Sequence, residues 1–219
     1  MILVFVAMIV IMKNKTTLIV IGAIVALIVI IGIAFTSTSN SLATSREATV
    51  AAFAKVQSQY QRRADLVPNL VKVVQQSVTS EKDILQSVTE ARAKATSITI
   101  DPTKATPDQL AAYQNAQGQL GSSLGKLLAV SEQYPQLKSI QGFTDLQTQI
   151  EGTENRITTA RNDFNTSVQS YNSKLVTFPA SVVAGMGGFQ KAVYFQSDPG
   201  AEKAPDVNFA QPTTPATTK

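Results

Sequence analysis

The feature that most constrains this chain is an apolar run at residues 18–35, which no charged residue interrupts. As a helix rising 1.5 Å per residue, its roughly 18 positions would be about 27 Å long, close to the ~30 Å hydrocarbon core of a bilayer. We therefore predict a transmembrane helix at residues 18–35. The alternative is a cleaved signal peptide, because Ser41-Leu42-Ala43 offers small residues at a suitable spacing. The run is longer than the roughly 7 to 15 apolar residues typical of such signals, which favours a retained anchor.

Residues 1–17 form a predicted leader before this helix. Residues 1–11 are a second apolar run, which is too short to span a membrane alone. A short basic stretch before an apolar run is a usual start for an anchored protein, so Met12 is an alternative initiator. Lys13 and Lys15 outweigh Arg46 on the far flank of the transmembrane helix. The positive-inside rule then predicts a single-pass cell-membrane protein with a cytoplasmic N-terminus and an extracytoplasmic domain.

Beyond residue 36, apolar residues recur at steps of three and four, which is helical spacing. One stripe runs from residue 53 to residue 88 and a second from residue 110 to residue 134. A third repeats every seven residues, as in the seam of a bundle or coiled coil: Phe143, Ile150, Ile157, Phe164, Tyr171 and Phe178. The sequence predicts an all-α fold, with an antiparallel up-and-down bundle of three to four long helices at residues 36–196.

Pro68 interrupts the first stripe and leaves two interpretations open. A proline inside a helix costs about 3 kcal/mol or more, because it lacks an N–H and clashes with the preceding turn. If Asp65 is an N-cap, the stripe becomes two helices at residues 41–64 and 66–97, and the bundle has four helices. The alternative is one long helix kinked at Pro68, which the unbroken phase of the stripe favours.

Turn-forming residues mark the remaining boundaries of the predicted bundle. Residues 101–104 form a polar loop, and Thr106 with Pro107 predicts the N-cap and first position of the next helix. Gln141-Gly142 predicts the joint before the last long helix, which Pro179 ends. Residues 181–196 are apolar enough to dock on the end of the bundle or to touch lipid. Residues 197–219 have no core-forming pattern, and we predict a disordered tail.

Four motifs, in order along the chain, resemble the LemA family of membrane-anchored bacterial proteins. The signature is Gln61-Arg62-Arg63-Ala64-Asp65-Leu66-Val67-Pro68-Asn69-Leu70-Val71, followed by Glu132-Gln133-Tyr134-Pro135-Gln136-Leu137-Lys138, Thr153-Glu154-Asn155-Arg156-Ile157, and Tyr171-Asn172 with Phe178-Pro179. The resemblance implies an anchored helical bundle. The structural or interaction candidates are Arg62, Arg63, Asp65, Pro68, Asn69, Glu132, Tyr134, Pro135, Glu154, Asn155, Arg156 and Arg161. We expect Arg62, Arg63 and Asp65 to form an ion-pair and capping cluster, with Glu154 or Arg161 as partners.

The composition limits what chemistry the chain can carry. It has no Cys, His or Trp, which excludes thiol nucleophiles, histidine-based catalysis and Cys or His metal sites. The net charge of +4 includes Lys13 and Lys15, so the predicted domain has too little positive charge to suggest nucleic-acid binding. We therefore expect no catalytic residue, cofactor, metal or small-molecule substrate.

These features favour a non-enzymatic, membrane-anchored scaffold. A member of the family is associated with magnetosome membranes, so the resemblance implies organising or remodelling of envelope membrane as a specific form of this role. The expected partners are membrane lipid and either further copies of the chain or an envelope protein. The alternative hypothesis is an accessory or sensor subunit of a membrane protease or signalling complex.

Overall fold

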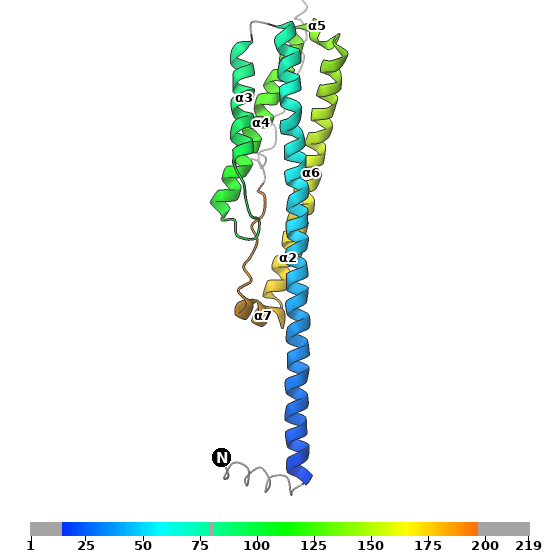
Figure 1. Cartoon of the computed structure of the whole chain (residues 1–219), viewed down its shortest axis with the longest axis vertical. Helices are drawn as coiled ribbons and strands as arrows, with labels where there is room; N and C mark the ends of the chain where they lie inside the picture. The colour runs from blue at the N-terminus through cyan, green and yellow to red at the C-terminus, as the bar shows by residue number, and fades with distance from the viewer. Residues whose placement is uncertain (1–14, 79–80, 197–219) are drawn as a thin grey trace, which may run out of the picture.

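A single helix, α2 (Lys15–Ser77), contains both the apolar run and the first helical segment of the bundle (Figure 1). The structure is a computed structural model that describes residues 15–78 and 81–196. The leader before residue 15, the alternative start at Met12 and the tail from residue 197 lie outside the described residues. An 18-residue stretch of α2 is long and apolar enough to cross a membrane. None of its residues is buried against the rest of the chain.

The bundle is formed by α2 beyond the apolar run, α3 (Lys82–Ser97), α4 (Pro107–Gln133) and α6 (Gln141–Val176). The short helix α5 (Pro135–Lys138) joins α4 to α6. Figure 1 shows α3 and α4 covering one side of α2, with α6 running back along α2 toward its apolar end. This confirms the predicted all-α, up-and-down architecture, in its four-helix form.

The start of α4 is set by local sequence, as predicted. The Thr106 hydroxyl accepts a hydrogen bond from the backbone N–H of Gln109, and the Gln109 side chain accepts one from the N–H of Thr106. This reciprocal capping box satisfies two donors that a helix start otherwise leaves unpaired. Pro107 occupies the first turn, where a missing N–H costs nothing.

Two apolar clusters form the core along the length of the bundle. The cluster nearer the apolar run contains Leu42, Phe53 and Phe164, whereas the distal cluster contains Leu70 and Leu124. The seven-residue stripe of α6 contributes to both, and its buried members are Phe143, Ile150, Ile157, Phe164 and Tyr171. The stripe on α6 therefore faces the other helices over its whole length.

The prediction that Phe178 continues this stripe is wrong. The helix α6 ends at Val176, so Phe178 lies beyond it and the seven-residue geometry no longer applies. Its side chain is 84% exposed at the end of the bundle nearest the apolar run. A helical period places a residue on the seam only while the backbone remains helical.

The first of the two interpretations of Pro68, a helix break with Asp65 as N-cap, is also wrong. The helix α2 continues through Pro68, and Asp65 lies inside it, where its carboxylate accepts a hydrogen bond from the Gln61 side chain at 2.7 Å. The stripe does divide into two helices, but the division lies between Ser77 and Lys82. The predicted helices at residues 41–64 and 66–97 are therefore replaced by α2 and α3.

A contact from α3 explains how α2 tolerates the proline. Pro68 has no N–H to donate to the carbonyl of Ala64, four residues earlier in the helix. Arg92 on α3 donates from Nε to that carbonyl oxygen at 2.8 Å. The guanidinium therefore replaces the hydrogen bond that the proline removes, and it also links α3 to α2.

We expect Arg92→Ala to lower the free energy of unfolding by about 1.5 to 3 kcal/mol, because it leaves a helix carbonyl unpaired. In a Pro68→Ala background, residue 68 regains its N–H and can donate to Ala64 itself. Arg92→Ala should then cost at least about 1 kcal/mol less, as measured by a denaturant double-mutant cycle. Strictly additive effects would show that Arg92 does not compensate for the proline.

The chain reverses direction after α6. The helix α7 (Ala180–Gly187) packs against both α2 and α6. Its C-cap is Gly188, whose φ of 66° is a left-handed conformation that glycine adopts without a steric penalty. From there residues 189–196 extend along the bundle, back toward its distal end (Figure 1).

Candidate functional site

Arg63 is a buried charged side chain at the centre of the bundle, with 2% of its surface exposed. Its Nη1 donates to Glu154 on α6 at 2.8 Å. Its Nη2 donates to the backbone oxygen of Gln117 on α4 at 2.8 Å and to the Gln117 side chain at 3.0 Å. The Gln117 amide in turn donates to the carbonyl of Ala95 on α3 at 3.1 Å. This polar layer, Arg63, Gln117 and Glu154, therefore connects all four long helices.

The polar layer lies at the boundary between the two apolar clusters. On α2, Tyr60 belongs to the cluster nearer the apolar run and Ala64 to the distal one. Sliding any helix by one turn would separate the guanidinium from its acceptors and leave it buried without partners, which is costly. We infer that the layer fixes the register of the four helices.

A cavity of about 230 Å³ borders the guanidinium of Arg63, but both terminal nitrogens of the side chain already donate to protein acceptors. A Cβ at Gly121 would lie 3.2 Å from Arg63 Nη1, so a side chain there would require the guanidinium to shift by a few tenths of an ångström. The guanidinium also lies over the Tyr60 ring, 5.3 Å from its centre. Glu154 is 51% exposed, so the ion pair reaches solvent on one side only. These contacts favour a structural role for Arg63.

The structure brings Arg63 and Glu154 together and leaves most other candidates apart from them. Arg62, Pro68 and Asn69 are exposed on α2, and Glu132 and Asn155 are exposed on α4 and α6. Asp65 is exposed as well and caps no helix, which corrects the expected capping cluster.

Three further candidates make local contacts. The half-buried Tyr134 donates from its hydroxyl to Glu81 at 3.0 Å, next to the start of α3. Pro135 is the first residue of α5. Arg156 is exposed and donates to Thr153 on its own helix at 3.2 Å. The Tyr134 contact therefore joins the end of α4 to the start of α3, whereas the Arg156 contact stays within α6.

A second arrangement, which the sequence interpretation missed, holds residues 189–196 against α6. The Asn172 amide donates to the carbonyl of Ala192 at 2.8 Å and accepts from its N–H at 2.9 Å. Asn165, one helical heptad earlier, makes the same pair of bonds to Phe195 at 3.0 and 2.9 Å. Each asparagine thus satisfies an extended backbone as a neighbouring strand would. We call these two asparagines the backbone clamp.

The backbone clamp is anchored by an aromatic side chain. The Phe195 ring lies 5.3 Å from that of Phe164 and 6.1 Å from that of Phe53. Arg161 covers the same ring at 5.3 Å and donates to the carbonyl of Gln196 at 2.8 Å. Arg161 therefore holds the C-terminal segment. The hydrogen bonds given above for the polar layer come from Arg63 and Gln117.

The signal for this clamp was present in the sequence as a repeated pair. Phe164-Asn165 and Tyr171-Asn172 are seven residues apart, so each pair has the same orientation on α6. The aromatic member is buried in the core, and the asparagine beside it reaches the extended segment. Burial raises the pKa of the Tyr171 hydroxyl, which remains neutral and donates to the Gln190 carbonyl at 3.0 Å.

We expect Asn172→Asp to lower the free energy of unfolding by about 1 to 3 kcal/mol, because it replaces a donor with a carboxylate against the Ala192 carbonyl. Hydrogen exchange at the Ala192 amide should accelerate at the same time. Asn155→Asp is the matched control, since this asparagine is exposed on the same helix and should change stability by no more than about 0.5 kcal/mol. Equal effects of the two substitutions would contradict the clamp.

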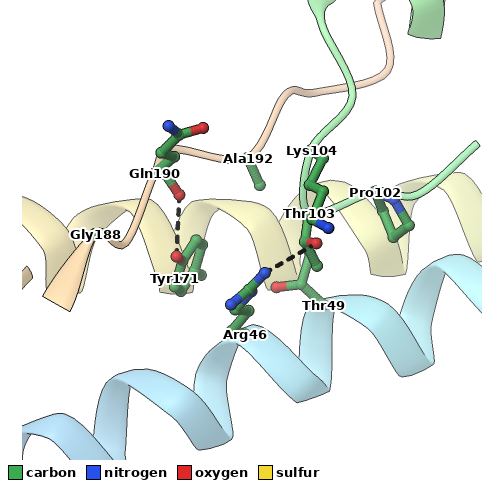
Figure 2. Close-up of a pocket in the computed structure, with 9 residues that line it drawn as sticks. All are labelled: Arg46, Thr49, Pro102, Thr103, Lys104, Tyr171, Gly188, Gln190 and Ala192. Carbon is green, nitrogen blue, oxygen red and sulfur yellow. Dashed lines mark hydrogen bonds between the residues drawn. The ribbon is translucent and has the colours of Figure 1, made fainter.

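A cavity of about 320 Å³ lies between α2, α6 and the loop that leads to α4 (Figure 2). Arg46 and Thr49 on α2 and Tyr171 on α6 form its floor, and Lys104 stands on the loop above. Arg46 donates to the Thr103 hydroxyl at 3.0 Å, which ties the loop to α2. Hydrogen bonds from Thr103 lower the pKa of the nearby Asp101, and Lys104 and Arg46 add to the effect. Arg46 and Lys104 give the wall of the cavity a positive charge, which the carboxylate of Asp101 partly balances.

A family comparison identifies the chain. The model of the LemA family matches residues 52–209, which includes the polar layer and the backbone clamp. The chain belongs to the LemA family. The predicted resemblance is therefore confirmed.

Curated relatives of this LemA protein include magnetosome proteins. Magnetosome protein MamQ 2 of Paramagnetospirillum magneticum is 29% identical over 184 residues, which are 74% of this chain and 66% of the relative. Magnetosome protein MamQ of Magnetospirillum gryphiswaldense is 27% identical over the same shares. Protein LemA of Metamycoplasma hominis is 30% identical over 117 residues, 53% of this chain and 50% of its own. The chain thus matches less than two thirds of the length of each of these relatives.

Within the described part of this LemA protein, no three His, Cys, Asp or Glu side chains gather as a metal site would require. Arg63 and Gln117 inside the bundle, and the half-buried Asn165 and Asn172 beside the C-terminal segment, bind backbone groups, one another and one carboxylate. The arrangement fixes helix register and holds the C-terminal segment. Its geometry supports a structural function of the bundle.

Proposed function

We propose that this LemA protein is a non-enzymatic, single-pass membrane scaffold whose bundle associates with further copies of itself or with envelope proteins. The observation that carries the proposal is the continuity of α2, which leads from the apolar run into the bundle without a linker. The part of α2 beyond residue 35 is about 60 Å long at 1.5 Å per residue. The anchor therefore holds the bundle at a set height and orientation above the bilayer.

Burial of Leu42 supports retention of the anchor. Cleavage after Ala43 would remove Leu42, which is 0% exposed and belongs to the apolar cluster nearer the membrane. It would also cut α2 in the middle of a turn. A retained anchor keeps both the core residue and the helix.

The magnetosome names of two relatives support a role in organising a membrane. A bundle held upright on its anchor presents the same lateral surfaces from every copy, so contacts between copies would arrange the anchors in the bilayer as well. The bundle is proposed to be extracytoplasmic, because Lys13 and Lys15 precede the anchor and the positive-inside rule keeps them in the cytoplasm.

Lysine cross-linking in native membranes, followed by mass spectrometry, tests the proposal. Exposed lysines are distributed along the bundle, including Lys72 on α2, Lys126 on α4 and Lys138 on α5. A link between two copies of the same lysine is unambiguously intermolecular, and we expect such links. One stoichiometric heterologous partner without self-links would instead support an accessory subunit of a membrane protease or signalling complex. A chain that links to nothing would contradict both roles.

Protease added to intact spheroplasts tests the orientation. Digestion of the bundle is expected if it is extracytoplasmic. A bundle that stays protected until the membrane is permeabilised would reverse the orientation without affecting the scaffold role.

A further inference from the structure

Exposed large apolar side chains are confined to two parts of the described chain. One is the apolar run at residues 18–35, which lies in a helix that is long and apolar enough to cross a membrane. The other is the C-terminal turn, with Val176, Phe178, Val182 and Met186, followed by Tyr194 on the extended segment. Phe178 is 84% exposed and Met186 is 74% exposed. Such a patch at one end of a bundle that otherwise buries its apolar residues indicates an interaction surface.

This patch lies at the height where the apolar run leaves the membrane. Near the end of α6, Lys174 donates to the hydroxyls of Ser41 and Ser45 on α2. Higher on the bundle, the Thr49 hydroxyl contacts that of Ser167 at 3.2 Å. Because α6 descends as α2 rises, residues beyond Lys174 lie beside the first turns of α2 after residue 35. Figure 1 shows α7 beside this part of α2.

The two faces of α7 have different surroundings. Val183 and Ala184 are buried in the cluster that also contains Leu42. Val182 and Met186 are exposed on the remaining surface of the helix, and Phe178 is exposed on the turn before it. The bundle thus fixes α7 through one face and leaves the other apolar face without a partner among the described residues.

The charges around this patch suit an anionic bilayer surface. Residues 164–196 contain no Asp or Glu, and their charged side chains are Lys174 and Lys191. On α2, residues 36–46 carry Arg46 and no acidic residue. Binding at the boundary between headgroups and acyl chains strengthens with the apolar area that is buried there and with the attraction of nearby basic residues to anionic lipids.

We propose that Phe178, Val182 and Met186 form a foot that inserts into the interface of the leaflet next to the bundle. The inference requires the apolar run to span the membrane but does not require the scaffold role. The foot gives the protein a second lipid contact beside its anchor. Because the foot lies on one side of α2, it also fixes the rotation of the bundle about the anchor.

Site-directed spin labelling tests this inference directly, because the chain has no cysteine of its own. Phe178→Cys and Met186→Cys variants of the full chain are labelled separately and reconstituted in phosphatidylcholine vesicles containing phosphatidylglycerol. We expect both labels to collide more with oxygen than with a water-soluble nickel chelate. A label at Gln136 on α5 is the aqueous reference, and one at Ala26 in the apolar run checks the span independently.

Labels at Phe178 and Met186 that favour the nickel chelate would overturn the proposal. Labels shielded from both reagents would overturn it too, because a second copy or another part of the protein would then cover the patch. A label at Ala26 that favours the nickel chelate would show that the apolar run does not span the membrane. This outcome separates failure of the span from failure of the foot.

A helical insertion provides a second, independent test. Seven helix-forming residues placed after Ser37 add two turns and raise the bundle by about 10 Å, with little rotation. The insertion lies before Leu42, so the buried core is unchanged and the melting temperature should be kept. We expect the labels at Phe178 and Met186 to move from lipid to water. Unchanged lipid exposure in the lifted bundle would contradict a foot positioned by α2.

Discussion

Replacing Arg63 with alanine is expected to lower the free energy of unfolding by about 3 to 5 kcal/mol, because it removes a buried charge partner and opens a cavity. The substitution leaves the backbone oxygen and the side chain of Gln117 without their donor. At about 2 to 4 °C per kcal/mol, the melting temperature should fall by roughly 6 to 20 °C. Thermal unfolding followed by circular dichroism measures the change.

Two controls separate burial from charge at this position. Arg62→Ala removes the same side chain from an exposed position on the same helix, and should change stability by no more than about 0.5 kcal/mol. Glu154→Gln should cost only about 1 kcal/mol, because Glu154 is half exposed and water screens the pair. An Arg63→Ala protein of unchanged stability that loses membrane or partner association would make the polar layer a binding site.

Phe53→Ala should lower the free energy of unfolding by about 3 to 5 kcal/mol, through lost apolar contact and the cavity that remains. Phe53 is buried at the centre of an aromatic cluster, where its ring lies 5.3 Å from that of Phe164 and 6.0 Å from that of Tyr113. It also stacks on Phe195, so hydrogen exchange in residues 189–196 should accelerate together with the loss of global stability.

Phe53→Leu and Lys55→Ala provide the comparison for this substitution. Leucine fills much of the space, so the loss should be clearly smaller than with alanine. Lys55 is exposed two residues away, and its replacement should be nearly neutral. If alanine and leucine were equally well tolerated at position 53, the aromatic cluster would not stabilise the bundle as described.

Local patterns predicted the parts of this fold that local physics determines. The cap at Thr106 depends on residues within one turn, and the seven-residue stripe of α6 needs only a continuous helix. Both could therefore be read from sequence. The same pattern failed at Phe178, because the sequence predicts that Pro179 ends the helix, whereas α6 ends at Val176.

Long-range contacts explain what the sequence did not predict. The proline at position 68 is tolerated because of Arg92, a partner on another helix that no local pattern identifies. The pairing of Arg63 with Glu154 was suggested by the family motifs, whereas Gln117, which completes the polar layer, was not. The backbone clamp needed the path of residues 189–196 before the role of Asn165 and Asn172 could be recognised.

The proposed scaffold role depends most on a continuous helix that joins the apolar run to the bundle. Spin labels at Ala34→Cys and Asn69→Cys, both exposed positions on α2, test this continuity by pulsed electron paramagnetic resonance in lipid nanodiscs. An unbroken helix places the two backbone positions about 52 Å apart, at 1.5 Å for each of the roughly 35 steps between them. We predict a narrow distance distribution near that value. A broad distribution, or a much shorter distance, would show a hinge between the apolar run and the bundle and would contradict a continuous helix.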